Sequence, residues 1–423
     1  MPLHVGIDDT DSPRAMCTTY VGYRLVEELV RRGFALRGLP RLIRLNPNCP
    51  YKTRGNCAIG LSLEADERRA QEVLEVAVQA VRRWADLGHE FTEPAVVVLR
   101  GEVAAELKDF SRRAVRELLH VEEARELLER HRALWATLKE SGLGLIGALA
   151  AAAYEFSGNS TYELLAYRQS GSWGRPRLVE ETSVLSMDER TRPYTFDNVD
   201  YSTGEIRITP HTPCPVLYGI RGVDPYHLCL AHALVRAREP VEGWLIYETN
   251  QASDEHLQRL KVGALRPYVS ARILGYISSR PRVERGGHLF FGLRDETGEV
   301  RCAVYEPMKG LRRQLLALEL GDVVEVDGAY KPREGQEVTL NVERIRVLRL
   351  APKVRRLAPP CASCGGRMKS YGLASGYRCA RCGARAGPEA ARLVEVARQL
   401  QPGTYEAPAR ARRHLAKPLA RIY

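Results

Sequence analysis

Hydrophobic and polar residues alternate most regularly between residues 268 and 350. Their period of two predicts five strands separated by turn residues, with a short helical pattern between the third and fourth strands. The predicted strands are residues 269–279, 288–294, 300–305, 323–330 and 338–348, and the helix is 311–318. This order is that of an OB-fold, a small barrel that often holds single-stranded nucleic acid. A small barrel without a ligand would show the same pattern.

The patterns before residue 265 mix helices with strands. Residues 3–7 form an apolar run typical of a strand, and Val21, Leu25 and Leu29 mark one face of a helix predicted over residues 20–32. A long charged helical pattern follows at residues 102–139. Beyond Gly158, three strand patterns and one helix predict a small antiparallel sheet with helices on one face. The strands are residues 162–168, 205–208 and 244–247, and the helix is 227–238.

Changes of pattern near residues 156, 264 and 352 divide the chain into four predicted domains. They are an α/β domain at 1–156, an α+β domain at 157–264, the OB-fold at 265–352 and a cysteine-containing basic tail at 353–423. A chain of 423 residues is long enough for them, since one domain takes about 100–200 residues. The predicted fold class is therefore multidomain, combining α/β and α+β units with a β-barrel.

Composition excludes membrane, secreted and disordered proteins. Hydrophobic residues make up 44% of the chain and charged residues 27%, as in folded soluble proteins. The longest uncharged apolar stretch, residues 142–154, is far shorter than the roughly 20 residues that span a bilayer. The first twelve residues carry three Asp and no basic region followed by an apolar one, so they do not form a signal peptide. A cytoplasmic protein is expected, with no membrane contact.

The positive charge of the chain is concentrated at its C-terminal end. Residues 351–423 hold 15 Lys and Arg against 3 Asp and Glu, whereas the net charge of the whole chain is +11. A basic segment of this kind favours a polyanionic partner such as nucleic acid, because each phosphate contact releases counterions. The alternative is a solvated tail that aids solubility.

Four of the ten cysteines fall in this basic segment with the spacing of a zinc ribbon. Two CxxC pairs, separated by 14 residues, can present four thiolates to one tetrahedral zinc ion. The predicted ligands are Cys361, Cys364, Cys379 and Cys382. Cations beside the cysteines suit an RNA backbone, and the candidates are Arg367, Lys369, Arg378 and Arg381.

An acidic loop follows the first predicted strand. It reads GIDDTDS and places Asp8, Asp9 and Asp11 within four residues. Such carboxylates repel one another unless a cation lies between them, and Mg²⁺ favours a few carboxylates together with substrate phosphates. The loop therefore predicts a magnesium–nucleotide site, with an acidic turn that only caps a helix as the alternative.

Two segments carry groups suited to phosphate. MCTTY opens the predicted helix, where Thr18 or Thr19 either caps the helix or accepts a phosphoryl group. PYKTRGN at residues 50–56 offers phosphate-binding groups or forms a basic surface turn. Its candidate residues are Lys52, Arg54, Gly55 and Asn56.

A GxGxxG run at residues 142–147 follows a charged helical pattern, whereas a Rossmann fingerprint follows a strand. The Rossmann interpretation therefore fails. Gly144 and Gly147 either pack the helix predicted at residues 148–154 or hold phosphate on their N–H groups. The sequence leaves both roles open.

Several longer motifs occur together in one order along the whole chain. They are GIDDTDS, MCTTY, RLIRLNPNCPYKTRGN, IGALAA, TFDNVD, TPCPVLYGIRG and TNQASDEH, followed by the predicted OB-fold and zinc ribbon. In this combination the chain closely resembles the archaeal isoleucine-tRNA 2-agmatinylcytidine synthetases. The family pattern usually has a Gly where this chain reads Pro13-Arg14-Ala15, which leaves the conformation of that loop open.

The resemblance implies an ATP-dependent ligase that joins agmatine to C2 of the wobble cytidine of the isoleucine tRNA with a CAU anticodon. The modified tRNA then decodes AUA and no longer AUG. The resemblance also implies a kinase-like domain that autophosphorylates a threonine, matching Thr18, and a ferredoxin-like domain before the OB-fold and the ribbon. ATP, Mg²⁺ and structural Zn²⁺ are the expected cofactors.

Two further points are hypotheses within this family assignment. Asp197, Asp200 and Asp254 lie in polar motifs of the second domain and are candidate partners for the cationic ends of agmatine. Deleting residues 353–423 is expected to weaken tRNA affinity and spare threonine phosphorylation. The alternative functions are a non-catalytic single-strand binder, which has no use for clustered Asp, and a ligase for a different amine.

Overall fold

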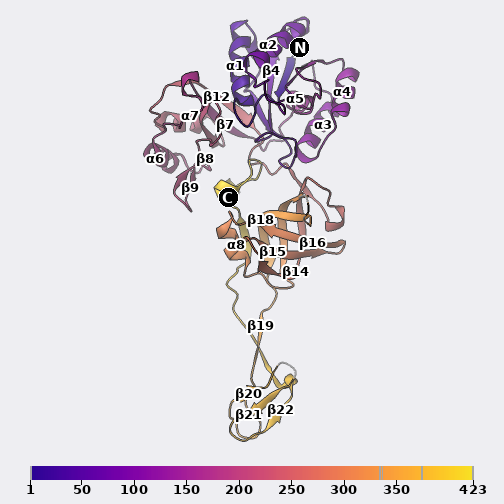
Figure 1. Cartoon of the computed structure of the whole chain (residues 1–423), viewed down its shortest axis with the longest axis vertical. Coiled ribbons are helices and arrows are strands. Elements are labelled where there is room, and N and C mark those ends of the chain that lie inside the picture. The colour runs from indigo at the N-terminus through magenta and orange to yellow at the C-terminus, as the bar shows by residue number, and fades with distance from the viewer. Residues whose placement is uncertain (1, 333–334, 336, 373–374, 422–423) are drawn as a thin grey trace.

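A ten-stranded sheet runs through the first two predicted domains (Figure 1). In the computed structural model, which describes residues 2–332, 335, 337–372 and 375–421, its order is β6-β5-β1-β4-β3-β12-β7-β11-β8, and β2 pairs with β4. The strands are β1 (Pro2–Asp8), β2 (Ala35–Leu36), β3 (Arg41–Arg44), β4 (Cys57–Glu64), β5 (Ala95–Arg100), β6 (Leu134–Thr137), β7 (Thr161–Arg168), β8 (Thr195–Phe196), β11 (Val216–Gly222) and β12 (Val241–Thr249). The two halves meet where β3 and β12 pair in parallel. The boundary placed at residue 156 stays a prediction, and we call residues 1–156 and 157–264 the first and second regions.

Helices cover both faces of the first region. They are α1 (Thr18–Arg31) and α2 (Ala70–Trp84) on one face, and α3 (Ala105–Arg116), α4 (Val121–Arg130) and α5 (Gly144–Ala153) on the other. Side chains of β5 alternate between the two cores, with Val96 and Val98 in the first and Val97 in the second. The single helical stretch predicted at residues 102–139 is wrong, because the chain there forms α3, α4 and the strand β6.

Helix α5 lies unusually close to the middle of the sheet. Gly6 and Gly60 face each other on β1 and β4. A Cβ atom on Gly6 would lie 1.8 Å from the carbonyl oxygen of Ala148, and one on Gly60 would lie 2.3 Å from that of Ala151. The absence of these side chains lets the alanine-rich helix pack against the strands backbone to backbone.

The second region adds an antiparallel sheet with its helices in one core, as predicted. Helices α6 (Glu181–Thr191) and α7 (Pro225–Leu234) pack with β7 and β11. The strand predicted at residues 205–208 is shorter, because β10 (Glu205–Ile206) pairs only with β9 (Val199–Asp200).

The predicted OB-fold strands form a closed barrel. They are β14 (Val269–Val283), β15 (Leu289–Asp295), β16 (Gly298–Val304), β17 (Val323–Lys331) and β18 (Thr339–Arg349), with α8 (Lys309–Leu315) between the third and fourth. Closure comes from the pairing of β14 with both β15 and β17, and of β18 with both β16 and β17. The short strand β13 (Leu257–Arg259) adds to β14.

The zinc-ribbon segment stands away from the rest of the molecule on a two-stranded stalk (Figure 1). The stalk pairs β19 (Val354–Leu357) with β23 (Arg392–Glu395), and the ribbon holds β20 (Met368–Ser370), β21 (Tyr377–Cys379) and β22 (Arg385–Ala386). The chain then returns, because β24 (Gly403–Glu406) pairs with β18. We call residues 398–421 the C-terminal strap. Its residue Leu415 packs in a core with Ile43 and Ala150 of the first region.

Candidate active site and nucleic-acid interface

The acidic loop opens into a cavity of about 790 Å³ in the first region. Asp8 is the last residue of β1, and Asp9 follows with a φ of +55°. The lining comes from segments within residues 8–13, 45–57, 89–93, 114–122 and 141–147. The cavity therefore brings together the acidic loop, the basic segment and the glycine run that the sequence singled out.

Two carboxylates in this cavity are held in surroundings that disfavour their charged forms. Burial and the neighbouring Asp9 carboxylate raise the pKa of Asp8 well above its usual value. Burial likewise raises the pKa of Asp9 to about 7, although the Glu93 N–H donates to its Oδ2 at 3.0 Å. A divalent cation would relieve both penalties, so the donor set fits Mg²⁺.

Asp11 is paired with a cation of the chain itself. The Nε of Arg54 lies 2.6 Å from Asp11 Oδ2, and Thr53 donates to Asp11 Oδ1 at 3.2 Å. A second N–H of Arg54 donates to the carbonyl of Met16, whose φ is +62°. Arg54, predicted as a phosphate ligand, thus braces the loop between the acidic residues and helix α1.

Thr18 is the first residue of α1 and is 2% exposed. The N-cap is Cys17, which makes no side-chain capping hydrogen bond, so the capping role considered for Thr18 and Thr19 is not observed. The next carbonyl, that of Thr19, accepts hydrogen bonds from the hydroxyls of Tyr167 and Tyr247 at 2.9 and 2.7 Å. Strands β7 and β12 of the second region therefore fix the start of the helix that carries Thr18.

The remaining residues that were predicted to bind phosphate lie together at this cavity. Lys52, Gly55, Asn56, Gly144 and Gly147 all line the cavity. Burial, with the nearby charge of Arg413, lowers the pKa of Lys52 to about 8. A Cβ on Gly147 would lie 1.8 Å from Asp8 Oδ2, so this glycine makes room for the carboxylate as well as packing α5.

The three carboxylates nominated for agmatine each contact the C-terminal strap. Arg412 of the strap donates to Asp197, and Arg410 lies 3.8 Å from Asp200. Asp254 accepts from the backbone N–H of Lys417 at 2.7 Å and pairs with arginines of the OB-fold. Each of the three therefore contacts a cation of this chain.

The four predicted zinc ligands do converge. Their sulfur atoms lie within 4.8 Å of one another, and the Cys361–Cys382 and Cys364–Cys379 pairs are each 3.5 Å apart. This spacing fits sulfurs bound to one zinc ion at about 2.3 Å. Gly365 and Gly383 follow the knuckles with φ of +67° and +76°. The neighbouring RNA candidates are exposed: Arg367, Lys369, Arg378 and Arg381.

A buried polar group on β7 was missed by the sequence analysis. Glu163 lies 3.3 Å from Arg221 and 3.9 Å from Arg44, and it accepts a hydrogen bond from Gln251 at 2.5 Å. The signal was a carboxylate inside an apolar strand, since Glu163 is only 5% exposed.

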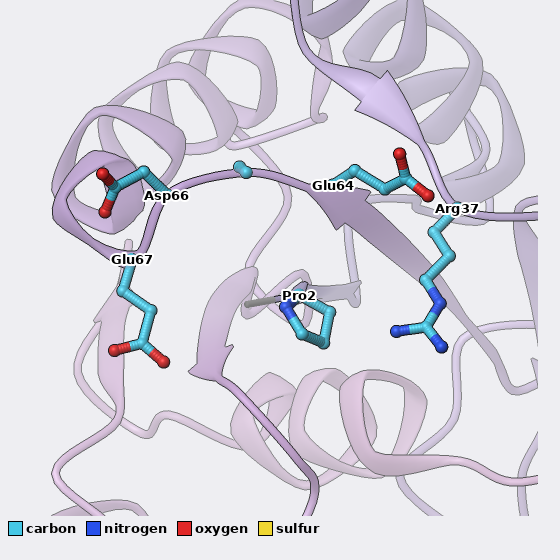
Figure 2. Close-up of a pocket in the computed structure, with 6 residues that line it drawn as sticks. Pro2, Arg37, Glu64, Asp66 and Glu67 are labelled. Atoms are coloured by element: carbon cyan, nitrogen blue, oxygen red, sulfur yellow. The ribbon is translucent and has the colours of Figure 1, made fainter.

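A second hollow lies at the opposite end of β1, around Pro2 (Figure 2). Glu64, Asp66 and Glu67 surround it together with Arg37. Asp66 accepts a hydrogen bond from the backbone N–H of Arg68 at 2.9 Å and so caps a short turn. None of its lining residues belongs to the motifs, so the cavity at the other end of β1 is the candidate active site.

Known proteins resemble this chain over its full length. A protein from Pyrococcus horikoshii named TiaS, a 2-agmatinylcytidine synthetase for tRNA(Ile), is 43% identical over 419 residues, which are 99% of this chain and 97% of the relative. This chain belongs to the TiaS family. Its domain models match in order: TiaS TCKD domain at residues 4–140, TiaS FLD domain at 142–256, OB-fold nucleic acid binding domain at 271–348 and TiaS C-terminal zinc ribbon domain at 358–400.

Two solved structures of the family share the whole architecture. A crystal structure of TiaS in complex with tRNA(Ile) and ATP superposes with a TM-score of 0.90 at 40% identity, covering 100% of this chain and 98% of that one. A complex of TiaS with tRNA(Ile), AMPCPP and agmatine gives 0.87 at 37% identity, covering 100% and 97%. Among the residues that the structure describes, no helix is long and apolar enough to cross a membrane.

Proposed function

We infer that this chain is an ATP-dependent ligase that joins agmatine to C2 of the wobble cytidine in the isoleucine tRNA with a CAU anticodon. The observation that carries this conclusion is the full-length likeness to TiaS structures bound to tRNA(Ile), ATP or its analogue, and agmatine. It is supported by an acidic cavity, a basic loop, an OB-fold and a four-cysteine ribbon in the same chain.

The chemistry explains why such a cavity is needed. The cytosine O2 belongs to a urea-like carbonyl and is a very poor leaving group. Transfer of a phosphoryl group to O2 allows the amine of agmatine to attack C2, after which the C2–O2 bond breaks, phosphate departs and the new C–N bond remains. The attacking amine must be neutral, so it has to lose a proton before or during the attack.

The residues of the cavity divide between the metal and the phosphates. Asp8 and Asp9 would hold Mg²⁺. Asp11 could bind the ion only when its ion pair with Arg54 is broken. Bound there, Mg²⁺ would neutralise phosphate charge. Lys52 is the cation placed to meet a phosphate oxygen, with the N–H groups near Gly55, Asn56, Gly144 and Gly147 as further donors.

Thr18 is proposed as the residue that this domain autophosphorylates. Its place in the first turn of α1, directly after the acidic loop, supports this role. Because Thr18 is buried, phosphoryl transfer requires the loop braced by Arg54 to open. Loss of the Arg54 contacts is therefore part of the proposed reaction cycle.

The agmatine site is proposed among Asp197, Asp200 and Asp254. Two of these carboxylates lie beside guanidinium groups of the strap, and agmatine carries the same group. Agmatine would then compete with Arg410 or Arg412. Unchanged agmatine affinity after replacing all three Asp with Asn would reject this assignment.

Incubation with γ-labelled ATP, agmatine and a CAU-anticodon tRNA tests the function. The expected result is label on the protein and agmatine on the tRNA, with Thr18→Ala abolishing the protein label and slowing ligation. Binding of tRNA without either product would favour the non-catalytic binder. Label and tRNA modification with another amine, but not with agmatine, would favour a ligase of different specificity.

A further inference from the structure

Positive charge gathers where the two N-terminal regions, the OB-fold and the strap meet. Arg44 lies on β3, Arg221 on β11 and Arg413 on the strap, and Lys52 lies in the cavity wall, where burial and the nearby charges of Arg413 and Arg44 lower its pKa. These four residues form the cation cluster. They come from four separate segments, so the fold holds them together against their mutual repulsion.

Few carboxylates balance this charge. Glu163 serves both Arg44 and Arg221, and Glu343 pairs with Arg413 at 2.6 Å. Among the described residues, none places a carboxylate within ion-pair distance of Lys52. The Nε of Arg44 is buried without a hydrogen-bond partner among the described groups. Four cations against two carboxylates leave a net positive site.

The neighbouring residue His414 is also affected by the positive charge of the cluster. Arg221 Nη2 lies 2.7 Å from Nδ1 of His414 and donates to it, which requires that nitrogen to be unprotonated. The charges of Arg44, Arg221 and Lys52 hold the pKa of His414 well below its usual value. The cluster is thus prepared for an anion, because placing cations together without a counterion is unfavourable.

We propose that the cation cluster binds a phosphodiester of the RNA strand that runs from the OB-fold to the cavity. This inference rests on the proposed function. Arg413 ties the cluster to Glu343 on β18 of the OB-fold, and through Asn48, which accepts from it at 2.7 Å, to the loop that lines the cavity. Asn48 in turn donates to Ser270 of β14 at 2.9 Å. A strand crossing this junction delivers its base to the cavity.

Arg221→Gln, Arg221→Lys and a matched control test the proposal in the full-length protein. Arg82 is the control because it is exposed on α2, far from the OB-fold (Figure 1). The measurement is the affinity for the CAU-anticodon tRNA as a function of salt, alongside the affinity for ATP. Losing one phosphate contact should reduce the slope of log affinity against log salt by about 0.7 and weaken binding about tenfold.

Arg221→Gln is expected to show this smaller salt slope. Arg221→Lys should keep most of the wild-type slope, and Arg82→Gln should match the wild type. A wild-type slope in Arg221→Gln, or weaker ATP binding with unchanged tRNA binding, would overturn the proposal. If Arg221→Gln unfolds, Arg413→Gln gives the same readout. Failure of the wild type to bind this tRNA would instead refute the proposed function.

Discussion

Replacing Lys52 by Met is expected to stabilise the ligand-free protein at pH 7 while impairing its use of ATP. The Lys52 side chain is held partly buried, with Arg413 and Lys331 as nearby positive charges, and these surroundings lower its pKa from 10.5 to about 8. Removing the charge removes this unfavourable interaction, but it also removes the proposed phosphate contact of Lys52. The charge of Lys52 therefore lowers the stability of the ligand-free protein and serves the proposed function.

The size of the effect follows from the lowered pKa. A fall from 10.5 to about 8 corresponds to about 3.4 kcal/mol, and solvent screening of a partly exposed group reduces this to about 1–2 kcal/mol. The full penalty applies below the folded pKa of about 8, where Lys52 is charged in both states. Between about 8 and 10.5 the folded state loses its proton first, so the wild type gains stability with rising pH relative to Lys52→Met.

Denaturant unfolding of both proteins between pH 6.5 and 10.5 measures this difference. Lys369→Met serves as the control, because it removes the same charge from an exposed position. Magnesium and ATP should stabilise the wild type more than the variant at pH 7. A pH-independent difference, or a variant less stable than the wild type at pH 7, would refute the argument.

Three further predictions concern the ribbon, the strap and Gly147, which packs against Asp8. Gly147→Ala places a Cβ 1.8 Å from Asp8 Oδ2, so we expect a loss of about 1–3 kcal/mol in unfolding free energy and of magnesium-dependent labelling, measured by denaturation and γ-labelled ATP. Replacing residues 358–391 by a two-residue Asn-Gly turn joins Leu357 to its partner Arg392, and should weaken tRNA affinity with protein labelling intact. The structure revises the expectation that deleting residues 353–423 spares labelling. Truncation after residue 352 should lose labelling as well as tRNA affinity, because it also removes the strap contacts of Arg413 and Leu415; equal labelling in both deletions would contradict a role for the strap.

Local signals predicted the OB-fold and the ribbon well. The alternating pattern of a strand and the turn residues that end it lie within a few residues of one another in the sequence. Each barrel strand therefore starts within about two residues of its predicted start. The CxxC spacing likewise places four sulfurs together without knowledge of the rest of the fold. In contrast, β6 has four half-buried residues and no alternation, which hid it inside a charged helical pattern.

Contacts between distant segments could not be predicted in the same way. The basic tail was expected to face nucleic acid, yet Arg398 and Arg412 pair with Asp322 and Asp197 of other domains. Strand β1 is antiparallel to both its neighbours, so the general rule that ligands bind at the carboxyl ends of parallel strands does not place the acidic loop. The loop still lines the cavity because α5, which comes more than a hundred residues later in the sequence, covers it.

The parallel contact between β3 and β12 has a consequence for how the molecule can be taken apart. If the first and second regions were expressed as separate chains, each would present an unpaired edge strand, a template for aggregation. When coexpressed, the two fragments are expected to associate through these strands. When expressed alone, each is expected to aggregate. The chain of the ribbon, by comparison, enters and leaves through the adjacent paired strands β19 and β23, so removing the ribbon exposes no strand edge of the large sheet.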